Sequence, residues 1–274
     1  MDQKKNSVAK WFSDIRDRIV DEFFTVESEF SEKTPSLKKR QWNREGGGGG
    51  ESVVICGDVF EKAGVNFSTV YGKMRDSFAK EIPGAIESEG EFWASGVSVV
   101  VHACSPHVPA VHMNTRFICT SESWFGGGTD LTPTYPNEDD TTFFHDNLRI
   151  MCNRFDVQYY DKFKKNCDEY FYLPHRKEAR GVGGIFYDYL KGDFDNSFAF
   201  TRSVAECFLE VYAAIVKKRM YKKWTEQERD YQLIKRGRYA EFNLIYDRGI
   251  RFGLMTDGNP DAMFVSMPPM VKWE

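Results

Sequence analysis

The chain has 274 residues, a length that fits one large domain or two smaller ones. Hydrophobic residues make up 41% and charged residues 28%, which excludes an intrinsically disordered chain. The 37 basic and 41 acidic side chains leave a net charge of −4, so no global basic field exists for nucleic acid and any anionic ligand must meet local arginines.

The first predicted element is a helix that begins after Ser7, a residue type that caps helices well. Its apolar residues recur at helical spacing: Val8, Trp11, Phe12, Ile15, Ile19 and Phe23. A polar and basic stretch at 30–45 then leads into five consecutive glycines at 46–50, for which a flexible linker is the simplest interpretation. These glycines lack the Lys-Ser/Thr that ends a phosphate-binding Walker loop, so they do not indicate a nucleotide site.

Blocks of strands and helices follow the glycine tract. Four strands are predicted at 52–56, 97–104, 110–120 and 123–125, and the last of them ends in three glycines at 126–128. Three helices are predicted at 140–154, 156–171 and 196–220. Strands return at 239–246, 250–256 and 262–267. Because tight turns join antiparallel strands, we expect an α+β fold in a single domain that spans residues 1–274.

The cysteines and the N-terminus indicate where the protein resides. The six cysteines are scattered without a C-x-x-C pair, which is typical of free thiols in a reducing compartment. The N-terminus lacks the apolar core of a signal peptide and carries acids that are unusual in a transit peptide. No stretch approaches the roughly 18 apolar residues of a membrane-spanning helix. We therefore expect a cytoplasmic protein with no membrane span.

Polar side chains alternate along two neighbouring predicted strands. His112, Asn114 and Arg116 share one face of their strand, and Ser98 and His102 share a face of the preceding strand. If the two strands pair, one sheet surface presents a guanidinium that can bind an anion, an amide and titratable imidazoles together. A solvated strand face is the alternative interpretation, although such faces usually carry Lys, Glu and Thr.

Three glycines precede Thr129 and Asp130, and they let a ligand approach the backbone closely. Asp130 then points into the space that the glycines leave. The alternative is that Asp130 is only a local cap of a glycine-rich turn.

Histidines and arginines are the remaining candidate groups. All five histidines fall between His102 and His175, but their spacing carries no metal-ligand signature. Arginines beside glycine turns are candidate carboxylate binders, and surface ion pairs are the alternative.

Several long segments resemble the oxygen-dependent coproporphyrinogen III oxidases of haem synthesis. In chain order they are GDVFEKAGVNFSTVYG, VSVVVHA, PAVHMNTRF, WFGGGTDLTPTYP, CDEYFYLPHRKEARGVGGIFYDYL, RGRYAEFNLIYDRGIRFGL and FVSMPPMVKWE. The resemblance runs from about Trp11 to Glu274. It implies a seven-stranded antiparallel sheet flanked by helices on both faces, a ligand cleft between sheet and helices, and a homodimer. Relatives usually continue past the position of Glu274, so the chain is expected to be either truncated there or naturally short.

The family converts two propionates of the tetrapyrrole coproporphyrinogen III to vinyl groups, which gives protoporphyrinogen IX. Dioxygen is the co-substrate, and we expect neither an organic cofactor nor a required metal. By the resemblance, His112 is the proton donor and Asp130 is the acid that meets the pyrrole N–H groups. The expected substrate-binding residues, among which the arginines suit the propionates, are Ser98, Asn114, Thr115, Arg116, Arg180, Arg238, Asp257, Gly258 and Asn259. If a metal takes part, the candidate ligands are His102, His112, His145 and His175.

Two other functions are compatible with the residues alone. One is a tetrapyrrole-binding protein without turnover, although mere binding would not need an acid at the pyrrole nitrogens. The other is a metal-dependent oxygenase that uses the histidines.

Overall fold

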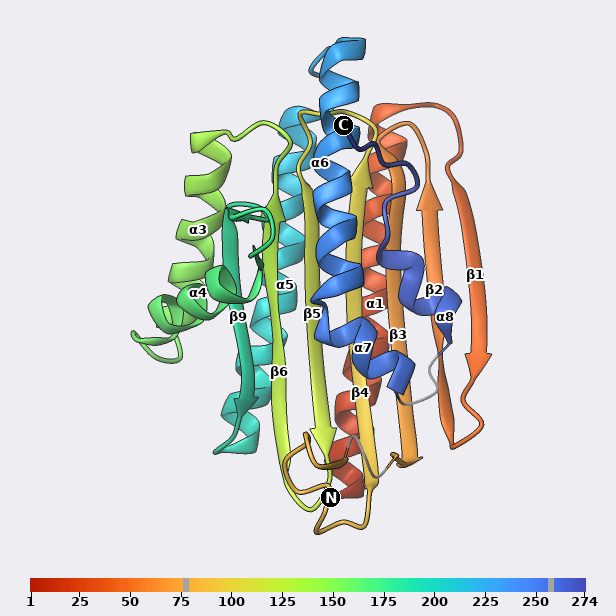
Figure 1. Ribbon diagram of the computed structural model, residues 1–274, viewed down its shortest axis with the longest axis vertical. Coiled ribbons are helices and arrows are strands. Elements are labelled where there is room, and N and C mark those ends of the chain that lie inside the picture. Colours follow the sequence, from red (N-terminus) through yellow and green to blue (C-terminus); the bar gives the residue numbers. More distant parts are fainter. Residues whose placement is uncertain (76–78, 256–258) are drawn as a thin grey trace.

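The computed structural model describes residues 1–75, 79–255 and 259–274 and is built on one seven-stranded antiparallel sheet (Figure 1). The strands are β1 (Ser36–Asn43), β2 (Gly48–Cys56), β3 (Phe60–Lys73), β4 (Glu91–Ala103), β5 (Ala110–Cys119), β6 (Ser123–Thr132) and β9 (Gly183–Leu190). Their order in the sheet is β1–β2–β3–β4–β5–β6–β9. From β1 to β6 each strand pairs with the next one in the sequence, and β9 then adds to the sheet beside β6. The expected α+β fold and its sheet are confirmed.

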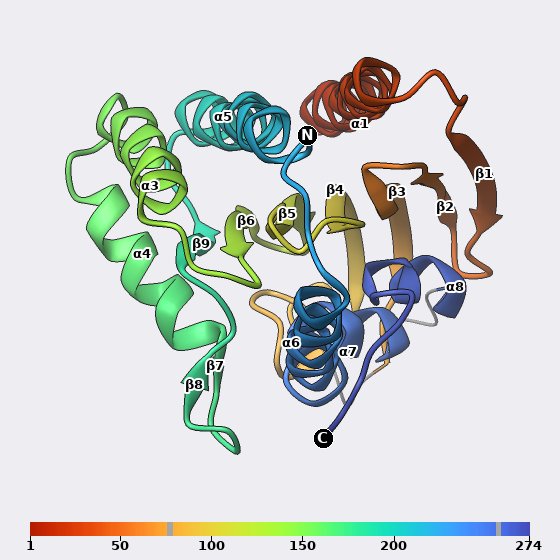
Figure 2. The ribbon, with the colours of Figure 1, turned by 90° about the horizontal axis from the view of Figure 1, so that it is seen from above.

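Helices cover both faces of the sheet (Figure 2). The first layer contains α1 (Asp2–Phe30), α3 (Glu138–Asn153), α4 (Tyr159–Tyr170) and α5 (Phe194–Arg219). The opposite face carries α6 (Glu226–Ile245), α7 (Arg248–Met255), α8 (Pro260–Met263) and a 3-10 turn, Phe264–Ser266. A small hairpin of β7 (Tyr172–Leu173) and β8 (Glu178–Ala179) lies between α4 and β9. The main hydrophobic core joins the first helix layer to the sheet, and the cleft described below lies on the other face.

The interpretation of the five glycines as a linker is wrong. Gly48, Gly49 and Gly50 begin β2 and pair with β3, and Gly49 and Gly50 also pair with β1. Gly48 has a φ of 80°, and a Cβ there would lie 2.2 Å from the Thr69 carbonyl oxygen. The glycines therefore let three strands approach where a side chain would collide. The preceding strand was not predicted because it is an edge strand that is exposed along most of its length.

The strand predicted at 123–125 is longer than expected, because the three glycines at 126–128, for which a turn was the alternative interpretation, lie inside β6. A Cβ on Gly127 would lie 2.4 Å from the carbonyl oxygen of Asn114, and one on Gly128 would lie 2.2 Å from that of Ile185. The glycines allow close contact with both neighbouring strands rather than a change of chain direction.

The C-terminal strands predicted between 239 and 267 are helices instead. The first, α6, begins at a capping box in which Thr225 and Glu228 satisfy each other's backbone N–H groups. Its buried face includes the polar residues Gln232, Arg236 and Asn243. A helix that buries polar groups lacks the apolar periodicity by which helices are recognised, and this explains the error.

Candidate active site

Cross-strand pairing places the predicted polar residues on one surface of the sheet. Read across β4, β5 and β6, the paired rows are Val100–His112–Asp130, Ser98–Asn114–Gly128 and Gly96–Arg116–Gly126. Partners that are directly opposite in an antiparallel sheet point to the same face. The expectation that these residues share one surface is confirmed, and Asp130 joins them directly opposite His112.

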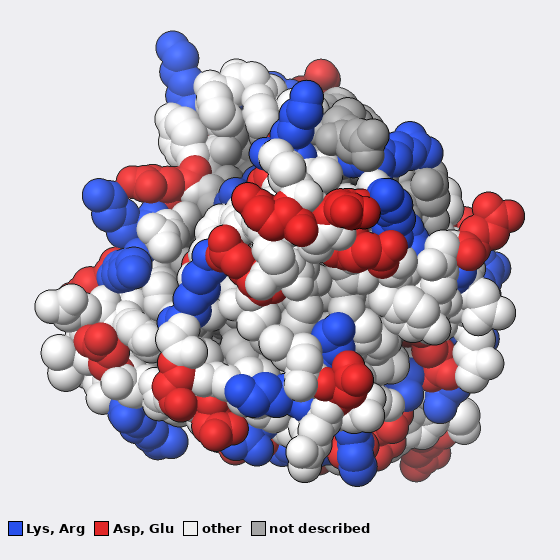
Figure 3. All heavy atoms as spheres, turned by 90° about the horizontal axis from the view of Figure 1, so that it is seen from below, with Lys and Arg blue, Asp and Glu red and all other residues white. Residues whose placement is uncertain are grey.

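This surface forms one wall of a cleft of about 490 Å³, which lies against α6, α7 and α8. Ser98, His112, Asn114 and Arg116 line the sheet wall, and Arg248 is among the residues that line the opposite wall. The volume is within the range of sites that bind drug-sized and cofactor-sized molecules. Figure 3 shows basic and acidic side chains interspersed over one end of the molecule, so an anionic ligand depends on individual arginines.

His112, Asp130 and Arg180 form one hydrogen-bonded group, called here the Asp130 cluster. His112 Nδ1 lies 2.9 Å from one Asp130 carboxylate oxygen, and Arg180 Nη2 donates to the other at 2.7 Å. The side chains of Asp130 and Arg180 are each 2% exposed, whereas that of His112 is 22% exposed. The imidazole therefore faces the cleft, and the carboxylate lies behind it.

Opposing effects act on the ionisation of Asp130. Burial alone would raise the pKa of this carboxyl group, but the charge of Arg180 and the hydrogen bond from His112 outweigh it. The pKa of Asp130 is consequently lowered, and the carboxylate remains charged in the protein interior. Its charge favours an N–H at the facing nitrogen of His112.

Aromatic rings and one amide hold Arg180 in place. Its guanidinium carbon lies 3.9 Å from the ring centre of Phe171, 4.5 Å from that of Tyr239 and 4.7 Å from that of Phe242. Its Nη1 donates to Asn243 Oδ1 at 3.2 Å. Arg180 lines the cleft, but its charge is directed at Asp130.

Arg116 and Arg248 line the cleft, where they can meet an anionic ligand. Arg116 Nη1 donates to Asn114 Oδ1 at 3.0 Å, and its Nη2 lies 2.8 Å from Asp188. The Arg248 guanidinium lies 4.7 Å from the ring centre of Tyr170. Arg248 was not among the predicted substrate-binding residues. Its segment was predicted as a hairpin turn, whereas it begins α7 at the cleft.

The other predicted substrate contacts are separated by the structure. Thr115 is fully buried on the opposite face of the sheet, so its side chain points away from the cleft. Arg238 contacts Glu178 at 3.3 Å and is not among the residues that line the cleft. Asn259 lines the cleft and caps α8, whereas Asp257 and Gly258 lie outside the described residues.

The histidines proposed as alternative metal ligands are dispersed. His102 is buried with Nε2 at 3.0 Å from the Ser266 carbonyl oxygen, and burial lowers its pKa to about 3. His145 lies on α3 in the first helix layer, and His175 lies between β7 and β8. Within residues 1–75, 79–255 and 259–274, no three His, Cys, Asp or Glu side chains are grouped so that they could hold a metal ion. None of the helices in the same residues is both long enough and apolar enough to cross a membrane.

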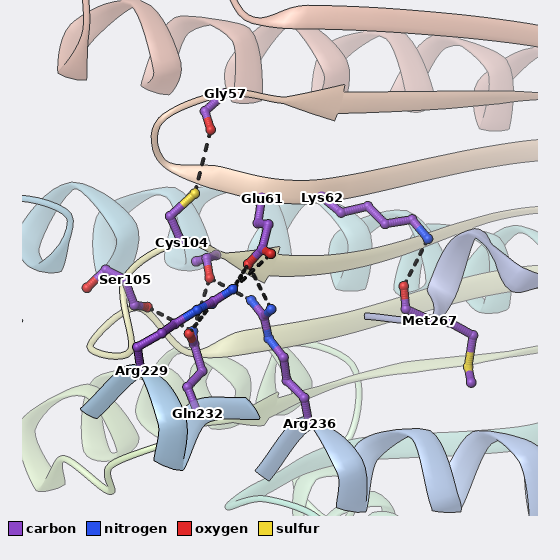
Figure 4. Close-up of polar contacts among 10 residues, drawn as sticks. Gly57, Glu61, Lys62, Cys104, Ser105, Arg229, Gln232, Arg236 and Met267 are labelled. Atoms are coloured by element: carbon purple, nitrogen blue, oxygen red, sulfur yellow. Dashed lines mark hydrogen bonds and ion pairs between the residues drawn. The ribbon is translucent and has the colours of Figure 1, made fainter. Parts of the chain in front are cut away.

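A charged cluster around Glu61 fixes the N-terminal half of α6 to the sheet (Figure 4). Arg229 Nη2 donates to the two Glu61 oxygens at 2.9 and 2.7 Å, and Arg236 Nη1 donates to one of them at 2.8 Å. Gln232 Nε2 donates to the Ala103 carbonyl oxygen at 3.0 Å. These contacts hold the C-terminal half of the helix above the cleft.

The chain is similar to known proteins along nearly its whole length. Residues 7–274 match the family model described as coproporphyrinogen III oxidase. The chain is 53% identical over 280 residues to an oxygen-dependent coproporphyrinogen-III oxidase of Rickettsia bellii, with 100% of both chains covered. It is 52% identical over 276 residues to the protein of the same name from Rickettsia rickettsii, with 99% of both chains covered.

Proposed function

This chain belongs to the coproporphyrinogen III oxidase family, and we propose that its cleft is where coproporphyrinogen III is oxidised, with the reacting propionate against His112. The family indicated by the sequence motifs is thereby confirmed. The activity is the oxygen-dependent oxidative decarboxylation of two propionates to vinyl groups. The assignment of the site rests on the Asp130 cluster. Its His112 imidazole faces the cleft, while Asp130 and Arg180 are buried behind it.

Each decarboxylation is a two-electron oxidation. A propionic side chain loses its carboxyl group as carbon dioxide and one further hydrogen, and a vinyl group remains. Dioxygen accepts the two electrons and two protons and leaves as hydrogen peroxide. Dioxygen is thus the co-substrate, and we propose that the reaction needs no resident cofactor or metal.

His112 is the proton-transferring residue in this proposal. Its Nδ1 is engaged by Asp130, so Nε2 is the nitrogen that can exchange a proton with the substrate. The buried charge of Asp130 fixes the tautomer and the direction of the ring. Asp130 then acts through His112 as a positioning residue, rather than at the pyrrole nitrogens as the resemblance implies.

Other residues of the cleft suit the pyrrole N–H groups and the propionates of the substrate. Ser98 and Asn114 lie in the row next to His112, where they can bond the pyrrole N–H groups. Arg116 and Arg248 suit the propionates, since a guanidinium binds a carboxylate through paired hydrogen bonds.

The assembly and location of the protein are further parts of the proposal. The family resemblance favours a cytoplasmic homodimer, and the scattered cysteines fit a reducing compartment. Sedimentation equilibrium of the purified chain tests the dimer, which a monomer at micromolar concentration would contradict.

Product analysis tests the function itself. The protein is incubated with reduced coproporphyrinogen III without oxygen, air is admitted, and the porphyrins are oxidised and separated by chromatography. We expect protoporphyrin after exposure to air and unchanged coproporphyrin before it. Binding without conversion in air would favour the tetrapyrrole-binding alternative.

A further inference from the structure

A chain of hydrogen bonds connects the C-terminal segment to the Asp130 cluster along one wall of the cleft. Arg180 donates through Nη2 to Asp130 at 2.7 Å and through Nη1 to Asn243 Oδ1 at 3.2 Å. Asn243 in turn donates through Nδ2 to Ser266 Oγ at 3.4 Å. Asn243 is 4% exposed, so these partners replace water for most of its amide.

The donors and acceptors in this chain allow one orientation of the Asn243 amide. Arg180 has only donors, so the amide must present its oxygen to the guanidinium. Ser266 Oγ donates its own proton to the Met263 carbonyl oxygen at 3.0 Å, which leaves that hydroxyl as an acceptor for the amide N–H. A flipped amide would break both contacts.

The turn that carries Ser266 is itself fixed to the sheet. His102 Nε2 lies 3.0 Å from the Ser266 carbonyl oxygen. Lys62 Nζ donates to the carbonyl oxygens of Phe264 and Met267 at 3.3 and 2.9 Å. The Ser266 hydroxyl therefore has a defined position relative to the strands that carry His112 and Asp130.

Arg180 needs such a support because its aromatic neighbours restrict only part of its motion. The rings of Phe171, Tyr239 and Phe242 pack around the guanidinium but offer no carboxylate or carbonyl acceptor at its Nη1. Hydrogen bonds at both ends fix its rotation within the plane.

We propose that Asn243 is a positioning residue for the reaction, which holds Arg180 against Asp130 and so fixes the imidazole of His112, and that Ser266 orients Asn243. This inference rests on the proposed function. It makes the C-terminal segment part of the reaction centre, although that segment contributes no group to the Asp130 cluster.

The groups that influence the ionisation of Asp130 come from several elements. His112 on β5 and Arg180 after β8 lower the pKa of Asp130 against the effect of burial, and Asp247 acts on Arg180. The charge of Asp130 in turn raises the pKa of the buried Cys167 on α4 and Tyr239 on α6. An Asn243→Asp substitution adds a second carboxylate at the same guanidinium while it keeps the size of the side chain.

The test compares Asn243→Asp, Asn243→Ala and Ser266→Ala in steady-state assays over pH. Asn243→Asp should leave KM for coproporphyrinogen III little changed and lower kcat by about tenfold or more. It should also move the acidic limb of the pH–kcat profile upward by about one pH unit, because two carboxylates then share one cation. Asn243→Ala should lower kcat without that upward move, and Ser266→Ala should lower kcat by a smaller factor.

Lys272→Met is the matched control, since it removes an ion pair of the C-terminal segment, with Asp230 at 2.9 Å, that involves neither Ser266 nor Asn243. It should leave kcat and the pH profile unchanged. Wild-type kcat in both the Asn243→Ala and Ser266→Ala proteins would overturn the inference, as would a Lys272→Met protein with the same kinetic change as those variants. If Asn243→Asp does not fold, the two alanine variants still decide the question. A wild-type protein that does not convert coproporphyrinogen III would instead contradict the proposed function.

Discussion

Asp130→Asn is expected to lower stability and turnover together, because one carboxylate supports both Arg180 and His112. Asparagine keeps the shape and one acceptor oxygen but removes the charge that faces the guanidinium. Both side chains of the ion pair are 2% exposed, and removing one partner of a buried pair costs about 3–5 kcal/mol. At about 2 °C per kcal/mol for a chain of this size, the melting temperature should fall by about 6–10 °C.

Turnover per folded molecule should fall by roughly 10²–10⁴, the range that a positioned acid–base group contributes. Asp146→Asn is the control, since it removes an exposed carboxylate from α3 on the far side of the sheet. Melting curves and single-turnover assays separate the two effects. A destabilised variant with a normal rate per folded molecule would refute the role through His112, and an unchanged melting temperature would refute the role through Arg180.

The same substitution should change how stability depends on acid. The pKa of Asp130 in the folded protein lies below its ordinary value of 3.8, so its stabilising contribution is complete above about pH 4 and is lost as the pH falls further. Asp130→Asn should lack this part of the acid dependence in urea unfolding measured at a series of pH values.

Three other outcomes follow from the site. Arg116→Lys should raise KM by about tenfold, because lysine keeps the charge but loses the two-point contact that Arg116 can offer a propionate, and an unchanged KM would contradict that contact. Activity should survive exhaustive chelation, and loss of turnover that one divalent metal restores would show that a metal is required. His102→Gln should flatten the decline in unfolding free energy below pH 6.5, because the pKa of His102 is lowered to about 3 by burial and only the unfolded chain takes up the proton in between. Identical slopes for wild type and variant in urea titrations would contradict this reasoning.

Strand alternation was sufficient to place much of the site. Side chains in a strand alternate strictly, so the shared face of His112, Asn114 and Arg116 follows from their spacing. The register with β4, in which Ser98 lies opposite Asn114, brings Ser98 onto the same surface, whereas a shift by one residue would have placed it on the other face. The position of Asp130 on that surface required in addition that the three glycines before it continue the strand, which turn preferences contradict.

The opposite wall of the cleft could not be predicted in this way. The buried face of α6 carries Gln232, Arg236 and Asn243, whose partners lie far away in the sequence. Patterns of apolar residues contain no information about such contacts. The helical position of Arg248 and the burial of Asp130 behind His112 depend on the same tertiary packing, so they emerge only from the structure.

Release of carbon dioxide from carboxyl-labelled coproporphyrinogen III tests the central claim most directly, when wild type is compared with His112→Gln in air. The wild-type protein should release the carboxyl groups of both reacting propionates. The variant should bind the substrate with similar affinity but release carbon dioxide about 10²–10⁴ times more slowly. A His112→Gln protein that releases carbon dioxide at the wild-type rate would contradict the assignment of the reaction to this cleft.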